Sequence, residues 1–145
     1  MRVMFLVIVI ALLVSCNRET LVLQSQYIYP DHLASVHAGT PDPRKENPDI
    51  GQRLIIRWAF TREVFRELKD GELTLVVSAR FGVGDDDVKE YPIEKNRGLV
   101  IYSLLNDQYF QKGGIVTYKA EILHNGEVVE WWHHQVWTEI IDVEI

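Results

Sequence analysis

Residues 52–60, QRLIIRWAF, and residues 72–81, ELTLVVSARF, alternate apolar and polar side chains with a period of two. Successive side chains of a β-strand point to opposite faces, so this pattern predicts two strands that are each buried on one face. The polar face of the first segment carries Arg53 and Arg57. The apolar faces consist of Leu54, Ile56, Trp58 and Phe60 in the first segment and Leu73, Leu75, Val77, Ala79 and Phe81 in the second.

Further strands are expected on both sides of these two segments. Residues 89–93 (KEYPI) contain Pro92, which places this strand at a sheet edge because proline cannot donate a ladder hydrogen bond. Residues 98–104 (GLVIYSL) are rich in β-branched and aromatic residues. Residues 114–123 (GIVTYKAEIL) place four residues on one face, namely Val116, Tyr118, Ala120 and Ile122.

The dipeptide Asn125-Gly126 lies between two β-rich runs and favours a type I′ hairpin turn. We therefore expect residues 115–124 to pair with residues 128–138, with residues 139–145 (EIIDVEI) continuing the strand after a bend. The best helical segment is residues 61–69 (TREVFRELK), with Thr61 as its N-cap. Residues 106–114 (NDQYFQKGG) predict a turn or a single helical turn.

Four of the five prolines fall within residues 30–48, which predicts an extended edge segment followed by a loop. With seven or eight short strands and one short helix, the chain is expected to be all-β, and it resembles the antiparallel sandwiches of the immunoglobulin and fibronectin type III kind. Tyr118, followed by Ala120 and Ile122, resembles the tyrosine-corner strand of those folds. A small lipocalin-like or other barrel is the alternative, with little room for a ligand cavity.

The first 16 residues follow the order of an export signal. Arg2 gives a positive start, and the apolar run from Val3 to Val14 spans only about 18 Å as a helix, well short of the ~30 Å hydrocarbon core. The run ends in Leu13, Val14, Ser15 and Cys16, which resembles the lipobox of bacterial lipoproteins. The resemblance implies removal of residues 1–15 and acylation of Cys16, the only cysteine, so that membrane lipid holds the chain.

Together with the strand pattern, this resemblance predicts three parts: a signal peptide (residues 1–15), a lipidated cysteine with a tether (residues 16–30), and a sandwich domain (residues 31–145). Within the tether, residues 21–23 are a candidate short strand. A general secretory signal with a chance cysteine is the alternative. Asn17 follows the cysteine, and in Gram-negative lipoproteins this is compatible with the outer membrane, while a Gram-positive cell surface remains open. Two segments, HLASVHAGTPDP (32–43) and GQRLIIRWAF (51–60), resemble small uncharacterised lipoproteins of chlamydia-type intracellular bacteria, which implies an envelope location and no known activity.

Composition and motifs argue against two classes of function. The formal net charge of -6, the pI of about 5.3 and the lack of a Lys/Arg cluster exclude a nucleic-acid binder. The sequence has no G-x-S-x-G, H-E-x-x-H or phosphate-binding glycine loop, and Ser35, His37 and Asp42 are close only along the chain. Residues 84–90 (GDDDVKE) do not follow the EF-hand pattern, which favours a solvated hairpin tip. We therefore expect no enzyme and no cofactor.

The stretch EVVEWWHHQVW (127–137) is the candidate binding segment. On a regular strand Trp131, His133 and Trp137 face one way, and if that face is exposed they form an aromatic platform for an envelope protein partner. The opposite face, with Trp132, Val136 and Ile140, is equally apolar, so the buried face is left open. The alternative function is a ligand or metal carrier using residues 130–137. No metal site is assigned, because His133 and His134 point apart and His124 is expected about 9–13 Å away.

Overall fold

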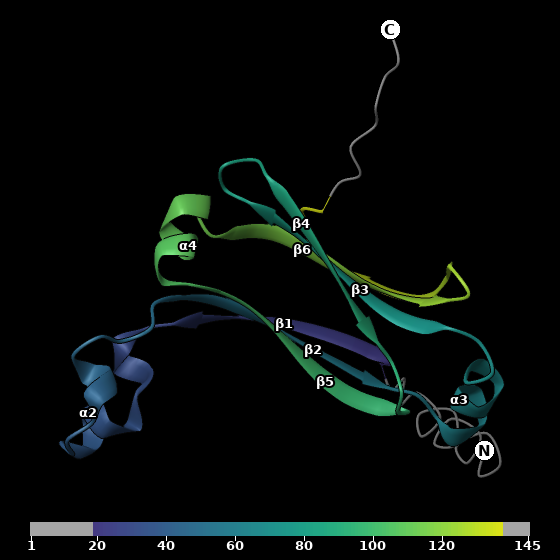
Figure 1. Cartoon of the computed structure of the whole chain (residues 1–145), viewed down its shortest axis with the longest axis horizontal. Coiled ribbons are helices and arrows are strands. Elements are labelled where there is room, and N and C mark those ends of the chain that lie inside the picture. Colours follow the sequence, from purple (N-terminus) through teal and green to yellow (C-terminus); the bar gives the residue numbers. More distant parts are fainter. Residues whose placement is uncertain (1–18, 138–145) are drawn as a thin grey trace, which may run out of the picture.

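Two antiparallel sheets pack face to face in the computed structural model, which describes residues 19–137 (Figure 1). The three-stranded sheet has the order β1-β2-β5 and the four-stranded sheet the order β4-β3-β6-β7. The strands are β1 (Leu21–Ile28), β2 (Gly51–Ala59), β3 (Leu73–Phe81), β4 (Asp86–Pro92), β5 (Arg97–Leu105), β6 (Ile115–His124) and β7 (Glu127–His133). The helical elements are short: η1 (Pro30–His32), α2 (Ala34–Ala38), η2 (Pro43–Lys45), α3 (Arg62–Leu68) and α4 (Asn106–Lys112).

The alternating segments form the core as predicted. Leu54 and Ile56 of β2 face Leu75 and Val77 of β3 in the interior, and all four side chains are fully buried. The hairpin prediction is also confirmed, because Asn125 and Gly126 both adopt positive φ and join β6 to β7. Strand β7 ends at His133 rather than at residue 138. The expected continuation over residues 139–145 lies outside the described residues.

Strand β1 corrects the expected tether. Leu21–Ile28 pairs with β2 along its whole length, and Leu21 and Leu23 are buried in the core. The sequence indicated only a short strand at residues 21–23, because the polar residues Gln24, Ser25 and Gln26 interrupt the apolar alternation. The sandwich therefore begins at Leu21, and the link from Cys16 to its first strand consists only of residues 17–20.

A β-bulge corrects the expected inner face of β6. Arg80 pairs with Thr117 and Phe81 pairs with Ile115, so Val116 is the extra residue. Ile115 is consequently buried, whereas Val116 is 54% exposed. The predicted inward positions Tyr118, Ala120 and Ile122 are confirmed, because they lie beyond the bulge.

The helical predictions succeed at two places and fail at one. Helix α3 has Thr61 as its N-cap, with the hydroxyl accepting a hydrogen bond from the Val64 amide at 3.3 Å. Residues 106–112 form the seven-residue helix α4, which is nearly two turns long and so exceeds the expected turn or single helical turn. Residues 30–48 contain three short helical pieces instead of an extended edge segment, and they project beyond one end of the three-stranded sheet (Figure 1).

Pro92 ends β4, which pairs only with β3 and so lies at an edge as expected.

The two sheets are joined by buried polar side chains as well as by the core. Gln52 of β2 is 3% exposed; its Nε2 donates to the Ser25 hydroxyl of β1 at 2.9 Å, and its Oε1 accepts from the Ile115 amide of β6 at 2.9 Å. Tyr118 of β6 reaches across the sandwich to the side chain of Ser25. This contact differs from the tyrosine corner suggested by the sequence, because the partner belongs to the facing sheet.

A second cross-sheet bond lies nearer the other edge of the sandwich. The Tyr102 hydroxyl of β5 donates to Asp87 Oδ2 of β4 at 2.7 Å. Burial, together with the hydrogen bond to this carboxylate, raises the pKa of Tyr102 well above its ordinary value. Tyr102 therefore stays protonated and remains a donor throughout the physiological pH range.

Replacing Gln52 by Leu is expected to destabilise the fold by about 1–3 kcal/mol, because the Ile115 amide would remain buried without its acceptor. The measurement is the free energy of unfolding in urea. Gln24→Leu is the matched control: Gln24 is exposed on the outer face of β1, so this change should stay within about 0.5 kcal/mol. Equal stabilities of the two variants would contradict the proposed cross-sheet role of Gln52.

Candidate interaction surface

The outer face of β7 carries a stacked pair of aromatic rings, Trp131 and His133. Their centroids are 4.7 Å apart and the rings are nearly parallel, at 3°. Trp131 is opposite Glu121 of β6 and His133 is opposite Lys119. Trp131 is 59% exposed, which meets the condition set for an aromatic platform. A large indole held open to solvent on a sheet is suited to recognition of another molecule.

Trp137 lies over the same sheet face, although it follows the end of β7. The Arg80 guanidinium carbon is 4.6 Å from the centre of the Trp137 ring, and the Lys119 ammonium nitrogen is 5.3 Å from it. Both contacts have cation–π geometry. Arg80 also pairs with Asp86 at 3.0 Å, and Lys119 with Glu121 at 3.2 Å. The three predicted residues Trp131, His133 and Trp137 therefore belong to one surface, which we name the aromatic surface.

Trp132 faces the interior and settles which side of β7 is inward. Its ring stacks on Tyr118 with centroids 5.8 Å apart and an interplanar angle of 6°. Ala120, its partner across the strands, is fully buried. A bulge in β7 sets this orientation, because Leu123 pairs with Val128 and Ile122 with Glu130, which leaves Val129 as the extra residue.

The histidines of this region are too far apart to share an ion. His133 pairs with Lys119, five positions along β6 from His124, which corresponds to about 17 Å along the strand. This separation exceeds the expected 9–13 Å. His133 Nδ1 instead lies 3.2 Å from the backbone oxygen of His134. Among residues 19–137, no group of three or more His, Cys, Asp and Glu is arranged to hold a metal ion.

The three aspartates of residues 85–87 also point to different partners. Asp85 pairs with Lys112 at 2.9 Å, Asp86 pairs with Arg80, and Asp87 accepts from Tyr102 in the facing sheet. Only part of this segment is therefore a solvated hairpin tip. Its carboxylates fasten β4 to its surroundings rather than converging on one point.

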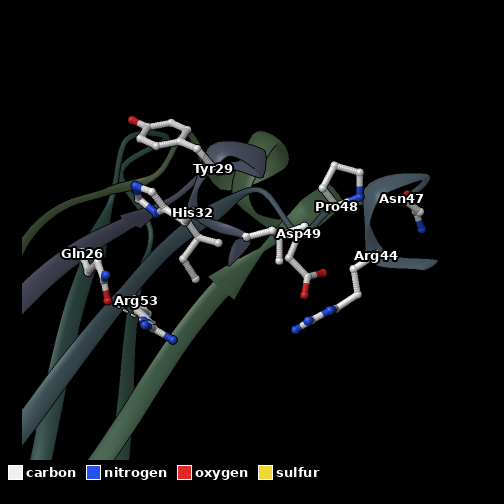
Figure 2. Close-up of a pocket in the computed structure, with 10 residues that line it drawn as sticks. Gln26, Tyr29, His32, Arg44, Asn47, Pro48, Asp49 and Arg53 are labelled. Atoms are coloured by element: carbon white, nitrogen blue, oxygen red, sulfur yellow. Dashed lines mark hydrogen bonds between the residues drawn. The ribbon is translucent and has the colours of Figure 1, made fainter. Parts of the chain in front are cut away.

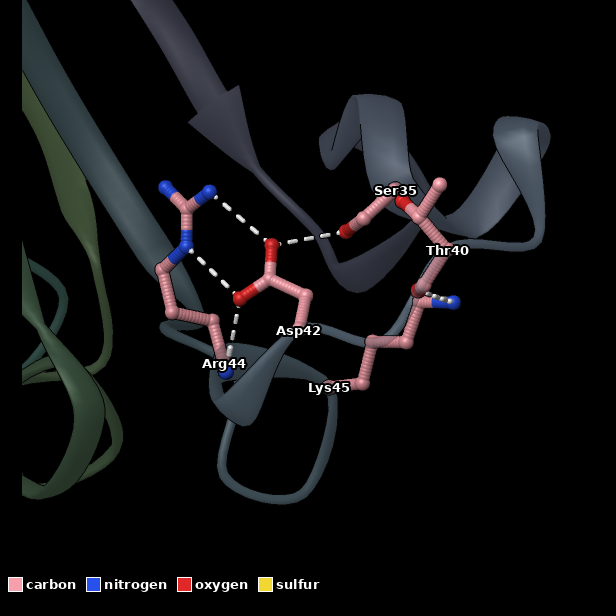
Figure 3. A network of polar contacts seen from close by, with 5 residues as sticks. All are labelled: Ser35, Thr40, Asp42, Arg44 and Lys45. Carbon is pink, nitrogen blue, oxygen red and sulfur yellow. Dashed lines mark hydrogen bonds and ion pairs between the residues drawn. The ribbon is translucent and has the colours of Figure 1, made fainter.

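Residues 30–50 form a small polar lobe that the sequence did not indicate. The Ser35 hydroxyl donates to Asp42 Oδ2 at 2.8 Å, and the Arg44 side chain donates to both carboxylate oxygens of Asp42 (Figure 3). The hydrogen bond from Arg44 holds the pKa of the Asp42 carboxyl well below its usual range. His37 Nε2 lies 2.8 Å from the backbone oxygen of Asp31, so Ser35, His37 and Asp42 do not form a relay.

A cleft of about 280 Å³ lies between this lobe and the adjoining ends of β1 and β2 (Figure 2). Arg53, Arg44 and Asp49 line it, so it presents charges of both signs. Arg53 donates to Gln26 Oε1 at 2.8 Å, and Asp49 accepts from Asn106 Nδ2 at 2.8 Å. The sequence did not reveal this cleft, because its walls come from segments that only the tertiary fold brings together.

No helix among the described residues is long and apolar enough to cross a membrane. Comparison with protein-family models, with curated proteins and with solved structures finds no match to this chain. A functional proposal therefore depends on the residues and the geometry described above.

Proposed function

We propose that this chain is a bacterial envelope lipoprotein whose sandwich domain is a non-catalytic interaction module. Residues 1–15 act as the signal peptide, Cys16 carries the acyl chains, and Asn17 is compatible with the outer membrane as the final location. The aromatic surface of Trp131, His133 and Trp137 binds an envelope protein. The observation that carries the binding role is the stacked Trp131–His133 pair on the outer face of β7, with 59% of Trp131 exposed.

The stacked arrangement makes this pair a useful anchor for a partner. A tryptophan that is already stacked loses little rotamer freedom on binding, so more of its contact energy contributes to affinity. Neighbouring polar and charged side chains, such as Lys119 and Glu121, supply the rim that surrounds such anchors in protein interfaces. The alternative of a metal carrier has less support, since His124 and His133 lie about 17 Å apart along the strands.

The strand order supports an immunoglobulin- or fibronectin type III-like sandwich. A constant-type immunoglobulin domain has strands A, B, E and D in one sheet and C, F and G in the other. Here the first, second and fifth strands form one sheet, and the fourth lies beside the third in the other. This arrangement resembles the fibronectin type III form. Domains of this architecture commonly serve as cell-surface interaction modules.

Cys16→Ser tests the anchor. The variant is expected to lose its lipid and to move from the membrane fraction to the soluble fraction, because a single thioether-linked cysteine would carry all the acyl chains. Fractionation of intact cells and metabolic labelling with a radioactive fatty acid give the two readouts. Ser15→Thr, which leaves the cysteine in place, controls for disturbance of the signal peptide. A Cys16→Ser protein that retains its lipid and its membrane location would contradict the proposal.

Photo-crosslinking tests the aromatic surface. A benzoyl-phenylalanine placed at Trp131 is expected to form a discrete adduct with an envelope protein in intact cells, because residue 131 would contact the partner directly. The matched control is the same group at Val88, which is 57% exposed on the outer face of β4. Replacing His133 by Ala in the same protein should weaken the adduct at position 131 severalfold, because His133 belongs to the same surface and would contact the partner as well. Equal adducts at positions 131 and 88, or none at 131, would argue against this surface.

A further inference from the structure

Charge is divided unequally between the two sheets. Strands β1, β2 and β5 contain three arginines and no Asp, Glu or Lys. The four-stranded sheet instead has more acidic than basic residues, the acidic ones being Asp86, Asp87, Glu90, Glu121, Glu127 and Glu130 and the basic ones Arg80, Lys89 and Lys119. In a chain of formal net charge -6, the three-stranded sheet is thus a locally positive layer.

All three arginines of this layer are on its outer face. Arg53, Arg57 and Arg97 occupy outward positions, and the strand register places Arg57 between Val22 and Leu99. In the next row, Ile55 lies between Gln24 and Ile101. Leu99 is 53% exposed and Ile101 is 47% exposed. The outer face therefore combines cationic and aliphatic side chains, and its strand positions include no carboxylate.

The chain enters the sandwich at one corner of this face. Glu19 and Thr20 line the same shallow hollow as Arg57, Arg97 and Leu99. Cys16 lies five residues before Leu21, and a fully extended chain spans at most about 3.6 Å per residue, so the link reaches no farther than about 18 Å. An anchor at Cys16 would thus hold the arginine face within reach of the lipid headgroups. Within the link the charge of Arg18 is balanced by that of Glu19, so the positive charge of this surface comes from the three arginines of the sheet.

We propose that the outer face of the β1-β2-β5 sheet lies against the anionic phospholipid surface in which Cys16 is anchored. This inference rests on the proposed lipid anchor. The arginines pair with lipid phosphates, while Leu99 and Ile101 enter the headgroup region. The aromatic surface belongs to the other sheet of the sandwich, and so it points away from the membrane, toward a partner.

Reporter thiols in the full chain test this orientation. An acylated Cys16 has no free thiol, so Ile101→Cys gives a single position for an environment-sensitive fluorophore. Two controls have similar exposure: Val64→Cys (44%) on α3, at the anchored end where it borders the face beside Arg97, and Val88→Cys (57%) on the opposite sheet. The labelled proteins are reconstituted into vesicles of phosphatidylcholine, alone or mixed equally with phosphatidylglycerol. Quenching by a doxyl-labelled lipid is then measured.

In the phosphatidylglycerol vesicles, quenching at position 101 is expected to be severalfold stronger than at positions 64 and 88. The combined Arg57→Gln and Arg97→Gln changes should lower the docked population by roughly fivefold per arginine, as should vesicles without the anionic lipid. Equal quenching at positions 101 and 64 would overturn the proposal, because the anchored end of the domain, rather than the outer face of the β1-β2-β5 sheet, would then contact the membrane. Quenching that is insensitive to both arginines and lipid charge would overturn it as well.

Two further outcomes have distinct meanings. If position 101 is shielded from aqueous iodide but not reached by the doxyl lipid, a second copy or another protein covers the face, and the lipid proposal is wrong. If the parent chain, without any reporter, reacts with a maleimide at Cys16, the anchor itself fails and this inference fails with it. An unreactive parent with equal quenching at 101 and 88 would refute only the orientation.

Discussion

In the described part of the chain, the two sheets of this sandwich share no backbone hydrogen-bond ladder, so their packing depends on contacts made by side chains. The core and a few buried polar groups hold the sheets together. Gln52 of β2 joins the sheets by accepting a hydrogen bond from the Ile115 amide of β6, while its Nε2 donates to Ser25 of β1 in its own sheet and so fixes the orientation of the amide. A buried side-chain amide with both hydrogen bonds made fixes how one sheet is placed over the other more specifically than apolar contacts do, because hydrogen bonds are directional.

The sequence predicts the elements that depend on local pattern. The alternation of residues 52–60 and 72–81 and the Asn125-Gly126 turn suffice for the central strands and the last hairpin. Features that depend on pairing partners were not predictable in the same way. The bulges at Val116 and Val129 change which side chains face inward, and a bulge is defined only once the opposite strand is in place. Only residues 21–23 of β1 were expected as a short strand, because Gln24, Ser25 and Gln26 break the apolar alternation.

The sequence predicted which residues belong to the candidate site but not how their side chains are arranged. The sequence indicated Trp131, His133 and Trp137 and left the exposed side of their strand open. Stacking of Trp132 on Tyr118 directs Trp131 outward, and the cation–π contacts of Trp137 with Arg80 and Lys119 required knowledge of two neighbouring strands. If Cys16 is acylated as proposed, the short link before β1 would hold the three-stranded sheet near the membrane and leave the aromatic surface of the other sheet free for a partner.

Mass spectrometry of the protein isolated from its own membranes tests the central claim most directly. The account predicts an N-terminal peptide that begins at Cys16 and carries the mass of a diacylglyceryl group on its sulfur. An N-terminal peptide that begins at Met1, or one in which Cys16 has a free thiol, would contradict it.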